Sequence, residues 1–441
     1  MIRRLWVNAF ASPYLRGFGL LTGGTFLSQL IPLFMLGVYT RIFSAEAFGM
    51  LTLLQAAVPL FVPLATGYFD VAILLPKQAW RAKALVSFAI VIACGVTVFA
   101  LLVLALIKQP FLAALNAEAM GNWVYAYPAV IFCSAILSIA SYWLLRQRRY
   151  GLQSALKLVL TASTALITFF CGMLGSRDGL LIGMLCGLLL AAGWGTWVMA
   201  RTGFPLTMRY VRVHHMKSLG RKYRNFPLYG SIPTAMSCLA QQFPLLIITA
   251  TYSLAIASHY AVVRNILFAG VSLIALCIGQ VFINYLMPRV HRNERIWPAT
   301  RQLALAVSAI ALCTSAAIYL IGPWFFPIFL GPGWEDTAHS TRTLAFATFF
   351  WMVAPTFSAV AVALERIRAV ALWQGIYCLT CPALLIARTL PFDTFIAWYT
   401  VFETAAYALY AAWMLYVIRK WDNQPHPPTK RSPTVLPYAA V

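Results

Sequence analysis

The sequence predicts an all-α, polytopic membrane protein with twelve transmembrane helices. Of its 441 residues, 61% are hydrophobic and only 10% are charged, whereas a soluble domain has about 25% charged residues. The mean hydropathy of +0.79 supports the same class. The 33 Lys and Arg residues against 11 Asp and Glu give a net charge of +22. They fall between long apolar runs rather than on one solvated surface, which argues against a nucleic acid as partner.

The predicted helices follow from the length of these apolar runs, since a membrane span needs about 20 mostly apolar residues. Most of the runs contain Gly, Pro or Ser, which membrane helices tolerate when neighbouring helices satisfy the freed backbone groups. The first run is too long for a cleavable signal peptide and lacks a small-residue cleavage site, so we expect it to insert as a permanent helix. The twelve runs are residues 18–40, 48–72, 84–107, 122–145, 154–175, 179–200, 226–250, 256–284, 303–329, 343–364, 369–387 and 395–418.

The basic residues predict the orientation of these helices, because Lys and Arg accumulate in cytoplasmic loops. If the N-terminus lies inside, twenty-seven of the 33 Lys and Arg residues fall in the inner segments and five in the outer ones, while Arg264 alone lies within a span. We therefore expect both termini to be cytoplasmic. The five outer residues are Arg41, Lys108, Arg177, Arg342 and Arg388.

The longest inner loop, residues 201–225, predicts a division of the chain into two halves. An N-terminal lobe, residues 1–200, would hold helices 1–6, and a C-terminal lobe, residues 226–420, helices 7–12. The tail, residues 421–441, contains five Pro and is expected to be disordered. Residues 27–33 match residues 239–245 at Leu, Gln, Pro and Leu with a constant offset of 212. Two parallel repeats around a central cavity are typical of some secondary transporters.

The cysteines and histidines indicate no metal site and no cofactor. All nine Cys lie within or beside apolar runs, where Cys behaves as a small hydrophobic residue. Cys378 and Cys381 have the spacing of a redox or metal-binding pair, but no second Cys or His pair accompanies them.

Three charged residues fall inside predicted spans, at an insertion cost of about 2.5–3.5 kcal/mol each. Arg264 carries a planar guanidinium that suits phosphate or carboxylate, so it either captures an anionic head group or pairs with Glu403. Asp70 either exchanges H⁺ or Na⁺, or accepts a hydrogen bond from a substrate sugar, or pairs with Lys77 or Arg81. Glu403 is the second candidate for ion coupling, unless Arg264 neutralises it.

Three further residues are candidates for substrate binding. Arg41, at the outer end of the first helix, is either an interfacial anchor or a substrate contact. Gln280 and Asn284 are four residues apart and share a helix face. Asn284 lies about 200° around a straight helix from Arg264, so these residues would form one site only if a glycine between them broke the helix.

Six motifs follow one another between residues 17 and 420. They are GTFLSQLIPLFMLGVYTRIFSAEAFG at 24–49, TGYFDVAILLP at 66–76, KYRNFPLY at 222–229, YAVVRN at 260–265, GQVF at 279–282 and GPGWEDTA at 331–338. In this order they resemble the motifs of bacterial polysaccharide-repeat flippases of the Wzx type. The most specific match is KYRNFPLY, which enters the seventh helix.

The resemblance implies a fold, an activity and a location. The implied fold is that of the multidrug/oligosaccharidyl-lipid/polysaccharide (MOP) exporter superfamily, with two six-helix lobes forming a V around a central cavity. The implied activity is translocation of polyprenyl-pyrophosphate-linked oligosaccharide from the cytoplasmic to the periplasmic leaflet of the bacterial inner membrane, for O-antigen, capsule or exopolysaccharide. Arg264 matches the family's eighth-helix Arg, and Asp70 matches a second-helix acid that is usually Glu.

The mechanism expected from this resemblance is alternating access, because a charged sugar head group cannot cross hydrocarbon unaided. Arg264 would hold the pyrophosphate, and Asp70 or Glu403 would couple transport to an H⁺ or Na⁺ gradient. The expected partners are the lipid-linked substrate and membrane lipids. The protein works either alone or beside a polysaccharide polymerase and co-polymerase.

Other functions are weaker alternatives. A drug or cation antiporter of the same superfamily would need acids that capture cations, and the first helix has none. A peptidoglycan-precursor flippase would be expected to carry two more helices. A membrane polysaccharide polymerase or ligase would need catalytic residues in a sizeable loop, and the outer loops are short. We therefore predict a transporter rather than an enzyme.

Overall fold

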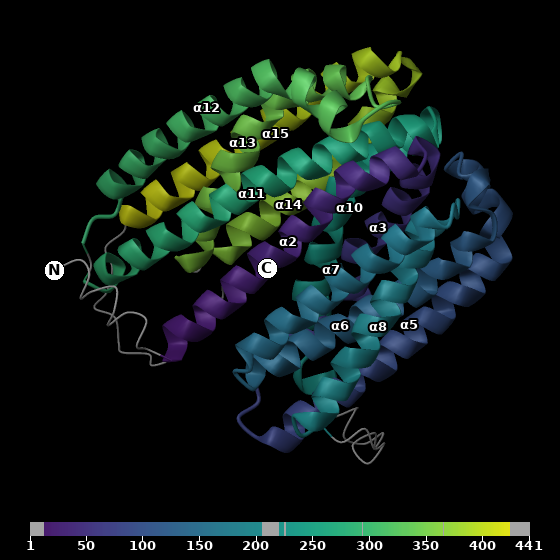
Figure 1. Ribbon diagram of the computed structural model, residues 1–441. Coiled ribbons are helices and arrows are strands. Elements are labelled where there is room, and N and C mark those ends of the chain that lie inside the picture. The colour runs from purple at the N-terminus through teal and green to yellow at the C-terminus, as the bar shows by residue number, and fades with distance from the viewer. Residues whose placement is uncertain (1–12, 205–219, 225, 293, 365, 424–441) are drawn as a thin grey trace. The chain divides into compact units, whose positions relative to one another are not determined.

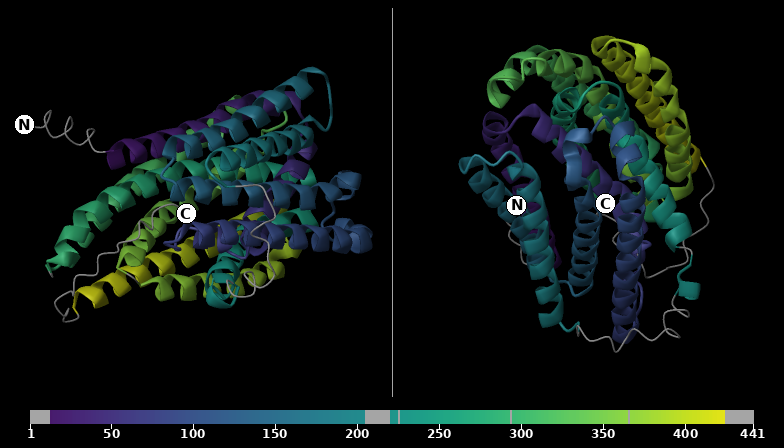
Figure 2. Two further views of the ribbon diagram at one scale, coloured as in Figure 1. Left: turned by 90° about the horizontal axis from the view of Figure 1, so that it is seen from below. Right: turned by 90° about the vertical axis from the view of Figure 1, so that its right-hand side faces the viewer.

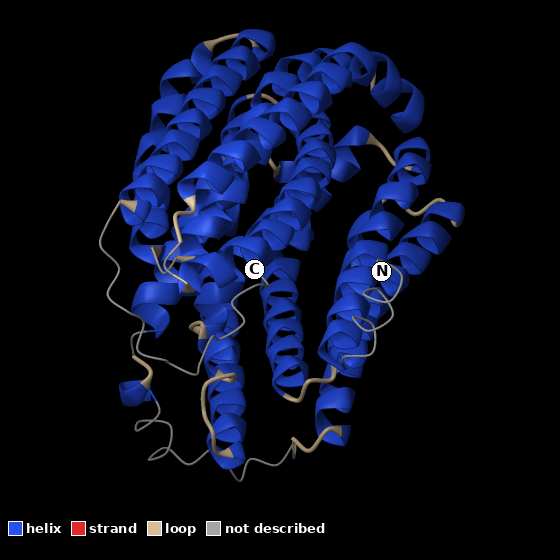
Figure 3. Cartoon of the chain, turned by 90° about the vertical axis from the view of Figure 1, so that its left-hand side faces the viewer, coloured by secondary structure: helices blue, strands red, loops and turns tan. Residues whose placement is uncertain are grey.

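The computed structural model describes residues 13–204, 220–224, 226–292, 294–364 and 366–423. This part of the chain contains helices and no strand, which confirms the all-α class (Figure 1, Figure 3). The elements, in chain order, are α2 (Pro13–Ile42), α3 (Ala45–Thr66), α4 (Phe69–Ala72), α5 (Ala79–Ala114), η1 (Glu118–Tyr125), α6 (Ala126–Arg146), α7 (Tyr150–Met173), α8 (Gly179–Arg201), η3 (Pro227–Ser231), α10 (Ile232–Thr251), α11 (Leu254–His291), α12 (Trp297–Leu330), α13 (Thr337–Ala363), α14 (Ile367–Thr380), η4 (Cys381–Thr389) and α15 (Phe392–Asp422).

Eleven helices in the described ranges are long and apolar enough to cross a membrane, which supports a multi-pass membrane protein. The predicted span 369–387 is the exception, because α14 ends at Thr380 and continues as the 3-10 segment η4. Pro382 lacks a backbone N–H and cannot donate the i→i−4 hydrogen bond of an α-helix, so the α-helical bonding ends near this point. The predicted span 48–72 is also interrupted, since α3 ends at Thr66 and α4 begins at Phe69.

The chain forms two compact units, Met1–Ser258 and His259–Val441. The helix α10, which begins the predicted C-terminal lobe, packs against α3 in the first unit. The predicted lobes, 1–200 and 226–420, stay a prediction. Residues 205–219 of the loop between them and residues 424–441 of the predicted disordered tail lie outside the described residues.

In the first unit, α7 packs along both α2 and α8, and α6 packs against α3, α5 and α8 (Figure 2). The seam between α7 and α8 is lined by small residues. Gly183 and Gly187 of α8 lie so close to Thr168 and Thr164 of α7 that a Cβ atom on either glycine would overlap the threonine. Small residues four apart allow two membrane helices to approach closely, so these glycines set the distance between the two helices.

The close approach predicts that Gly187→Val destabilises the first unit. The valine side chain would collide with Thr164, and overpacking of this kind costs about 1–3 kcal/mol. We expect a lower thermal unfolding midpoint of the purified protein in detergent. Gly193→Val is the matched control, since nothing lies within 4 Å of a Cβ at Gly193 on the same helix. Equal midpoints for the two variants would contradict this account of the seam.

In the second unit, α13 is the central helix, because it packs against both α12 and α15. A polar contact fixes its position, since the Ser315 hydroxyl of α12 donates to the Ala345 carbonyl oxygen and lies 2.7 Å from the Thr348 hydroxyl. The side chains of Trp351 and Phe357 on α13 are fully buried. This position of α13 brings Trp351 to the charged residues of the unit.

Candidate functional site

Glu403 lies in the core of the second unit, where it is only 1% exposed. Its Oε1 atom accepts a hydrogen bond from the indole N–H of Trp351 on α13, with an N to O distance of 3.1 Å. Its Oε2 atom accepts one from the hydroxyl of Tyr377 on α14, at 2.5 Å. Hydrogen bonds to an ionised acceptor are stronger than neutral ones, so both oxygens of this carboxylate are compensated for their burial.

Arg264 of α11 lies beside this carboxylate and is 7% exposed. Its guanidinium carbon is 5.6 Å from the ring centroid of Phe268 and 5.8 Å from that of Trp351. Arg264 and Glu403 interact electrostatically, but within the described ranges no carboxylate oxygen comes within the 4.0 Å of an ion pair with Arg264. Trp351 contacts both charged residues, with its N–H on the acid and its ring near the cation.

Two tyrosine hydroxyls complete this cluster. The rings of Tyr260 on α11 and Tyr399 on α15 meet edge to face, with centroids 5.7 Å apart. Both hydroxyls are close enough to Arg264 to interact with it electrostatically. Neither hydroxyl nor the Arg264 Nε atom makes a hydrogen bond of good geometry among the described residues, although the Tyr399 hydroxyl lies within reach of both Tyr260 and Arg264. Buried polar groups are normally paired, so the pairing of Arg264 Nε in this cluster is incomplete.

Sequence reasoning missed the two tyrosines, although the signal was present. Tyr260 precedes Arg264 by four residues, and Tyr399 precedes Glu403 by four. Residues four apart lie on the same face of a helix. An aromatic hydroxyl one turn from each buried charge was therefore visible in the sequence, whereas the approach of Trp351 and Tyr377 was not.

Asp70 lies in the first unit, beside the break between α3 and α4 in the second predicted span. Gly67 and Tyr68 both have left-handed backbone geometry, with φ values of 57° and 60°, and such geometry is uncommon for a residue with a side chain. Asp70 Oδ1 accepts hydrogen bonds from the Thr66 hydroxyl at 3.1 Å and the Val71 N–H at 3.0 Å. Asp70 Oδ2 accepts one from the Ser138 hydroxyl of α6 at 2.5 Å.

The predicted partners of Asp70 lie elsewhere. Neither Lys77 nor Arg81 forms an ion pair with it among the residues that the structure describes. The basic residue that holds this segment is Arg146, the last residue of α6, one position beyond the predicted span 122–145. Its guanidinium donates to the carbonyl oxygens of Ile73 at 2.8 Å and Pro76 at 2.5 Å.

The residues that directly follow the motif KYRNFPLY pack against this break. TGYFDVAILLP at 66–76 contains the break, and KYRNFPLY at 222–229 leads into the π-helical turn η3. The Ser231 hydroxyl donates to the Pro63 carbonyl oxygen at 2.7 Å. A Cβ atom on Gly230 would overlap the ring of Tyr68. Only glycine therefore fits where the seventh predicted helix crosses the break.

The bonding of Asp70 predicts different outcomes for two substitutions. Asp70→Asn keeps an acceptor for Thr66 and Val71 and can still pair with Ser138, so we expect a loss of unfolding free energy below about 1 kcal/mol. Asp70→Leu leaves buried donors unpaired and should cost about 1–3 kcal/mol. Thermal unfolding measures both variants. If Asp70→Asn unfolds like the wild type but transports poorly, the acid has a role in transport beyond holding the break.

The remaining predicted site residues are Arg41, Gln280 and Asn284. Arg41 is exposed at the end of α2. The side chains of Gln280 and Asn284 lie outside the described part of the structure, so their role stays a prediction. The helix α11 runs as one helix from Leu254 to His291, without the break that would be needed to bring Arg264 and Asn284 to one site.

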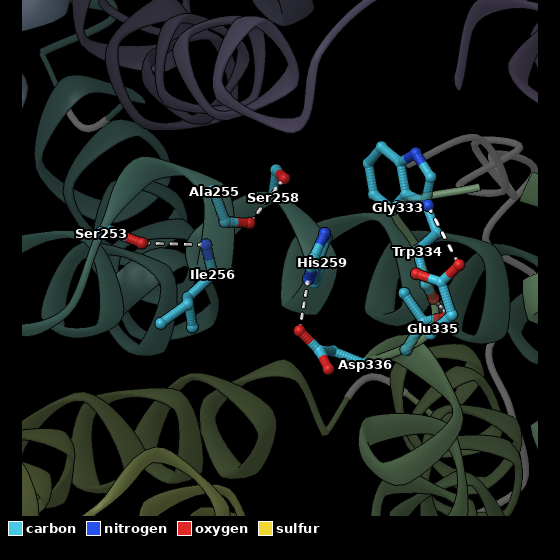
Figure 4. A network of polar contacts seen from close by, with 10 residues as sticks. Ser253, Ala255, Ile256, Ser258, His259, Gly333, Trp334, Glu335 and Asp336 are labelled. Atoms are coloured by element: carbon cyan, nitrogen blue, oxygen red, sulfur yellow. Dashed lines mark hydrogen bonds and ion pairs between the residues drawn. The ribbon is translucent and has the colours of Figure 1, made fainter. Parts of the chain in front are cut away.

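The motif GPGWEDTA packs against His259 of α11 (Figure 4). The buried ring of Trp334 lies 4.9 Å, centroid to centroid, from the ring of His259. His259 Nδ1 is 3.9 Å from Asp336 Oδ2. The exposed Glu335 carboxylate accepts a hydrogen bond from the Gly333 N–H at 3.2 Å, and its own N–H together with that of Gly333 lowers the pKa of Glu335. This motif shapes a loop between α12 and α13.

The described residues hold no group of three or more His, Cys, Asp or Glu that could bind a metal ion. Cys378 and Cys381 form no disulfide, and Cys381 is buried.

Comparison with known proteins places this fold. No protein-family model and no curated protein matches the chain. Among solved structures it is similar to an inward-facing multidrug resistance MATE family transporter of the MOP superfamily, with 12% identity over 89% of this chain and 96% of that chain and a TM-score of 0.71. It is similar to the lipid II flippase MurJ in an inward closed conformation, with 12% identity over 91% and 87% and a TM-score of 0.73. The Vibrio cholerae MATE transporter VcmN in its bent form gives 14% identity over 92% and 99% and a TM-score of 0.52.

Identities this low show a common fold and no more. The structures that share it belong to transporters and a flippase rather than to enzymes. The chain is a multi-pass membrane protein with the all-helical fold found in transporters of the MOP superfamily.

Proposed function

We propose that this protein is a flippase that moves polyprenyl-pyrophosphate-linked oligosaccharide repeat units from the cytoplasmic to the periplasmic leaflet of the bacterial inner membrane, for cell-surface polysaccharide synthesis. The lobes would alternate in access, and Asp70 or Glu403 would couple the movement to an H⁺ or Na⁺ gradient. The order of the six motifs supports this substrate class. The shared fold with a lipid II flippase is compatible with it.

The observation that carries the proposal is the state of the embedded charges. Both oxygens of Asp70 and both oxygens of Glu403 already accept hydrogen bonds. Arg264, by contrast, has an unpaired Nε and no direct ion pair among the described residues. A site for cationic drugs needs a free acid, whereas a site for a pyrophosphate needs a free cation. The balance of unpaired groups favours an anionic substrate.

The proposal is tested in a strain from which the gene is deleted. Spheroplasts are treated with a membrane-impermeant glycosidase, and the lipid-linked oligosaccharides are then extracted. We expect them to accumulate intact on the cytoplasmic side, and the wild-type gene should restore their cleavage. Unchanged sidedness together with lost resistance to toxic cations would instead establish a drug or cation antiporter. A multidrug resistance MATE family transporter is among the structures that share the fold.

A further inference from the structure

Lys157 is a basic residue that lies within a membrane-spanning helix rather than in a loop. It belongs to α7, seven residues after the start of the helix at Tyr150. At 1.5 Å per residue this places it about 10 Å along the helix axis. Its side chain is half-buried. The predicted span 154–175 contains Lys157, but the count of charges by segment assigned this residue to an inner loop, so it was not among the candidate residues.

This ammonium has few partners. Its Nζ atom donates to the hydroxyl of Thr25 on α2 at 3.0 Å. No carboxylate within the described ranges lies close enough to form an ion pair with it. An ammonium carries three N–H donors, so two remain for another acceptor. An embedded charge with one neutral partner is costly unless an anion or water accompanies it.

The surroundings of Lys157 are polar along the seam between α2 and α7. A Cβ atom on Gly24 would overlap the side chain of Ser154, so the helices cross closely at this point. Gln153 is buried one turn before Lys157 on the same helix face. Its Nε2 atom donates a hydrogen bond to the Ser141 hydroxyl oxygen at 3.0 Å, while its Oε1 atom has no partner among the described residues. Because a hydroxyl both donates and accepts, a rotated amide would offer its NH₂ group instead.

We propose that Lys157, together with Thr25 and Gln153, forms a phosphate-binding site in the first unit, which takes the pyrophosphate of the lipid-linked substrate. This inference rests on the proposed function. The lysine supplies a point charge for a phosphate oxygen, and the threonine hydroxyl and the glutamine amide supply further donors. Arg264 in the second unit is almost fully buried, whereas Lys157 is only half-buried.

The test measures binding of farnesyl pyrophosphate to the full-length protein in nanodiscs of phosphatidylcholine, by calorimetry. We expect Lys157→Met to raise the dissociation constant at least about tenfold. This corresponds to the loss of roughly one charge-assisted hydrogen bond. Lys157→Arg should restore most of the affinity, because it keeps the charge. Lys108→Met is the matched control, since Lys108 donates to Asn122 at an exposed position. Methionine replaces the embedded charge by an apolar side chain, so we expect the Lys157→Met protein to fold. Thr25→Val is a second variant that keeps the lysine, and it should weaken binding severalfold.

A phospholipid head group offers the same phosphate chemistry, and native mass spectrometry separates the two sources. If Lys157→Met loses co-purified phosphatidylglycerol but binds farnesyl pyrophosphate as the wild type does, the site holds membrane lipid and the inference is wrong. It is also wrong if neither ligand is affected. If the wild type itself fails to bind farnesyl pyrophosphate and deletion leaves the sidedness of lipid-linked oligosaccharides unchanged, the proposed function fails instead.

Discussion

Replacing Arg264 by alanine is expected to lower translocation about 10- to 100-fold. Hydrogen bonds to a charged group contribute about 1.5–3 kcal/mol, and Arg264 is the embedded cation of the second unit whose Nε lacks an acceptor in the described structure. The measurement is the fraction of lipid-linked oligosaccharide that a membrane-impermeant glycosidase cleaves in spheroplasts, normalised to the amount of protein in the membrane. Arg264→Lys should retain part of the activity, because the ammonium keeps the charge but loses the planar fork.

Arg388→Ala is the matched control for this experiment. Arg388 is an exposed arginine in η4 of the same unit, so its replacement should leave translocation unchanged. An Arg264→Ala protein that reaches the membrane in normal amounts and supports full cleavage would contradict the phosphate-binding role. Equal losses in both arginine variants would point to a general effect of net charge.

Replacing Glu403 by alanine is expected to lower the free energy of unfolding by about 2–5 kcal/mol, because each buried donor left without an acceptor costs about 1–3 kcal/mol. The substitution leaves the Trp351 N–H and the Tyr377 hydroxyl without their acceptor and Arg264 without its neighbouring negative charge. Glu403→Gln keeps one carbonyl acceptor and should lose less. Thermal unfolding of the purified protein in detergent measures each variant.

The double variant Arg264→Met, Glu403→Leu distinguishes the contribution of the two charges to stability from that of side-chain packing. Apolar residues of similar volume often replace a buried charge pair without loss, so we expect the double variant to unfold at a higher temperature than Glu403→Ala. Such non-additivity is diagnostic of residues that interact. Glu335→Ala is the control, because Glu335 is exposed. A Glu403→Ala protein as stable as the wild type would show that the cluster does not stabilise the second unit.

The helical spans were predictable, but their interruptions were less so. Every predicted span has a helical counterpart in the described residues, because an apolar run in a membrane must satisfy its backbone groups within one helix. The break at Gly67 and Tyr68 lies inside such a run. It depends on Ser138 and Arg146 of another helix, so hydropathy gave no signal for it.

The sequence identified the charged residues of the candidate site, but it did not predict which side chains contact them. Arg264 and Glu403 stand out in the sequence because charges are rare in apolar runs, and the structure does place them in one cluster. Whether they form a direct ion pair could not be read from their positions. The donors that reach Glu403 are 52 and 26 positions away along the chain. No local pattern predicts which side chains packing brings together over such separations.

The sequence by itself determined the class of this protein, its helical spans and the identity of its embedded acids and of Arg264, because hydropathy and charge act locally along the chain. The tertiary structure decided how each charge is compensated. Asp70 is bound by hydroxyl and amide donors, Glu403 by an indole and a phenol, and Lys157 by one threonine. Compensation depends on distances between side chains of different helices, and these are fixed only when the helices pack.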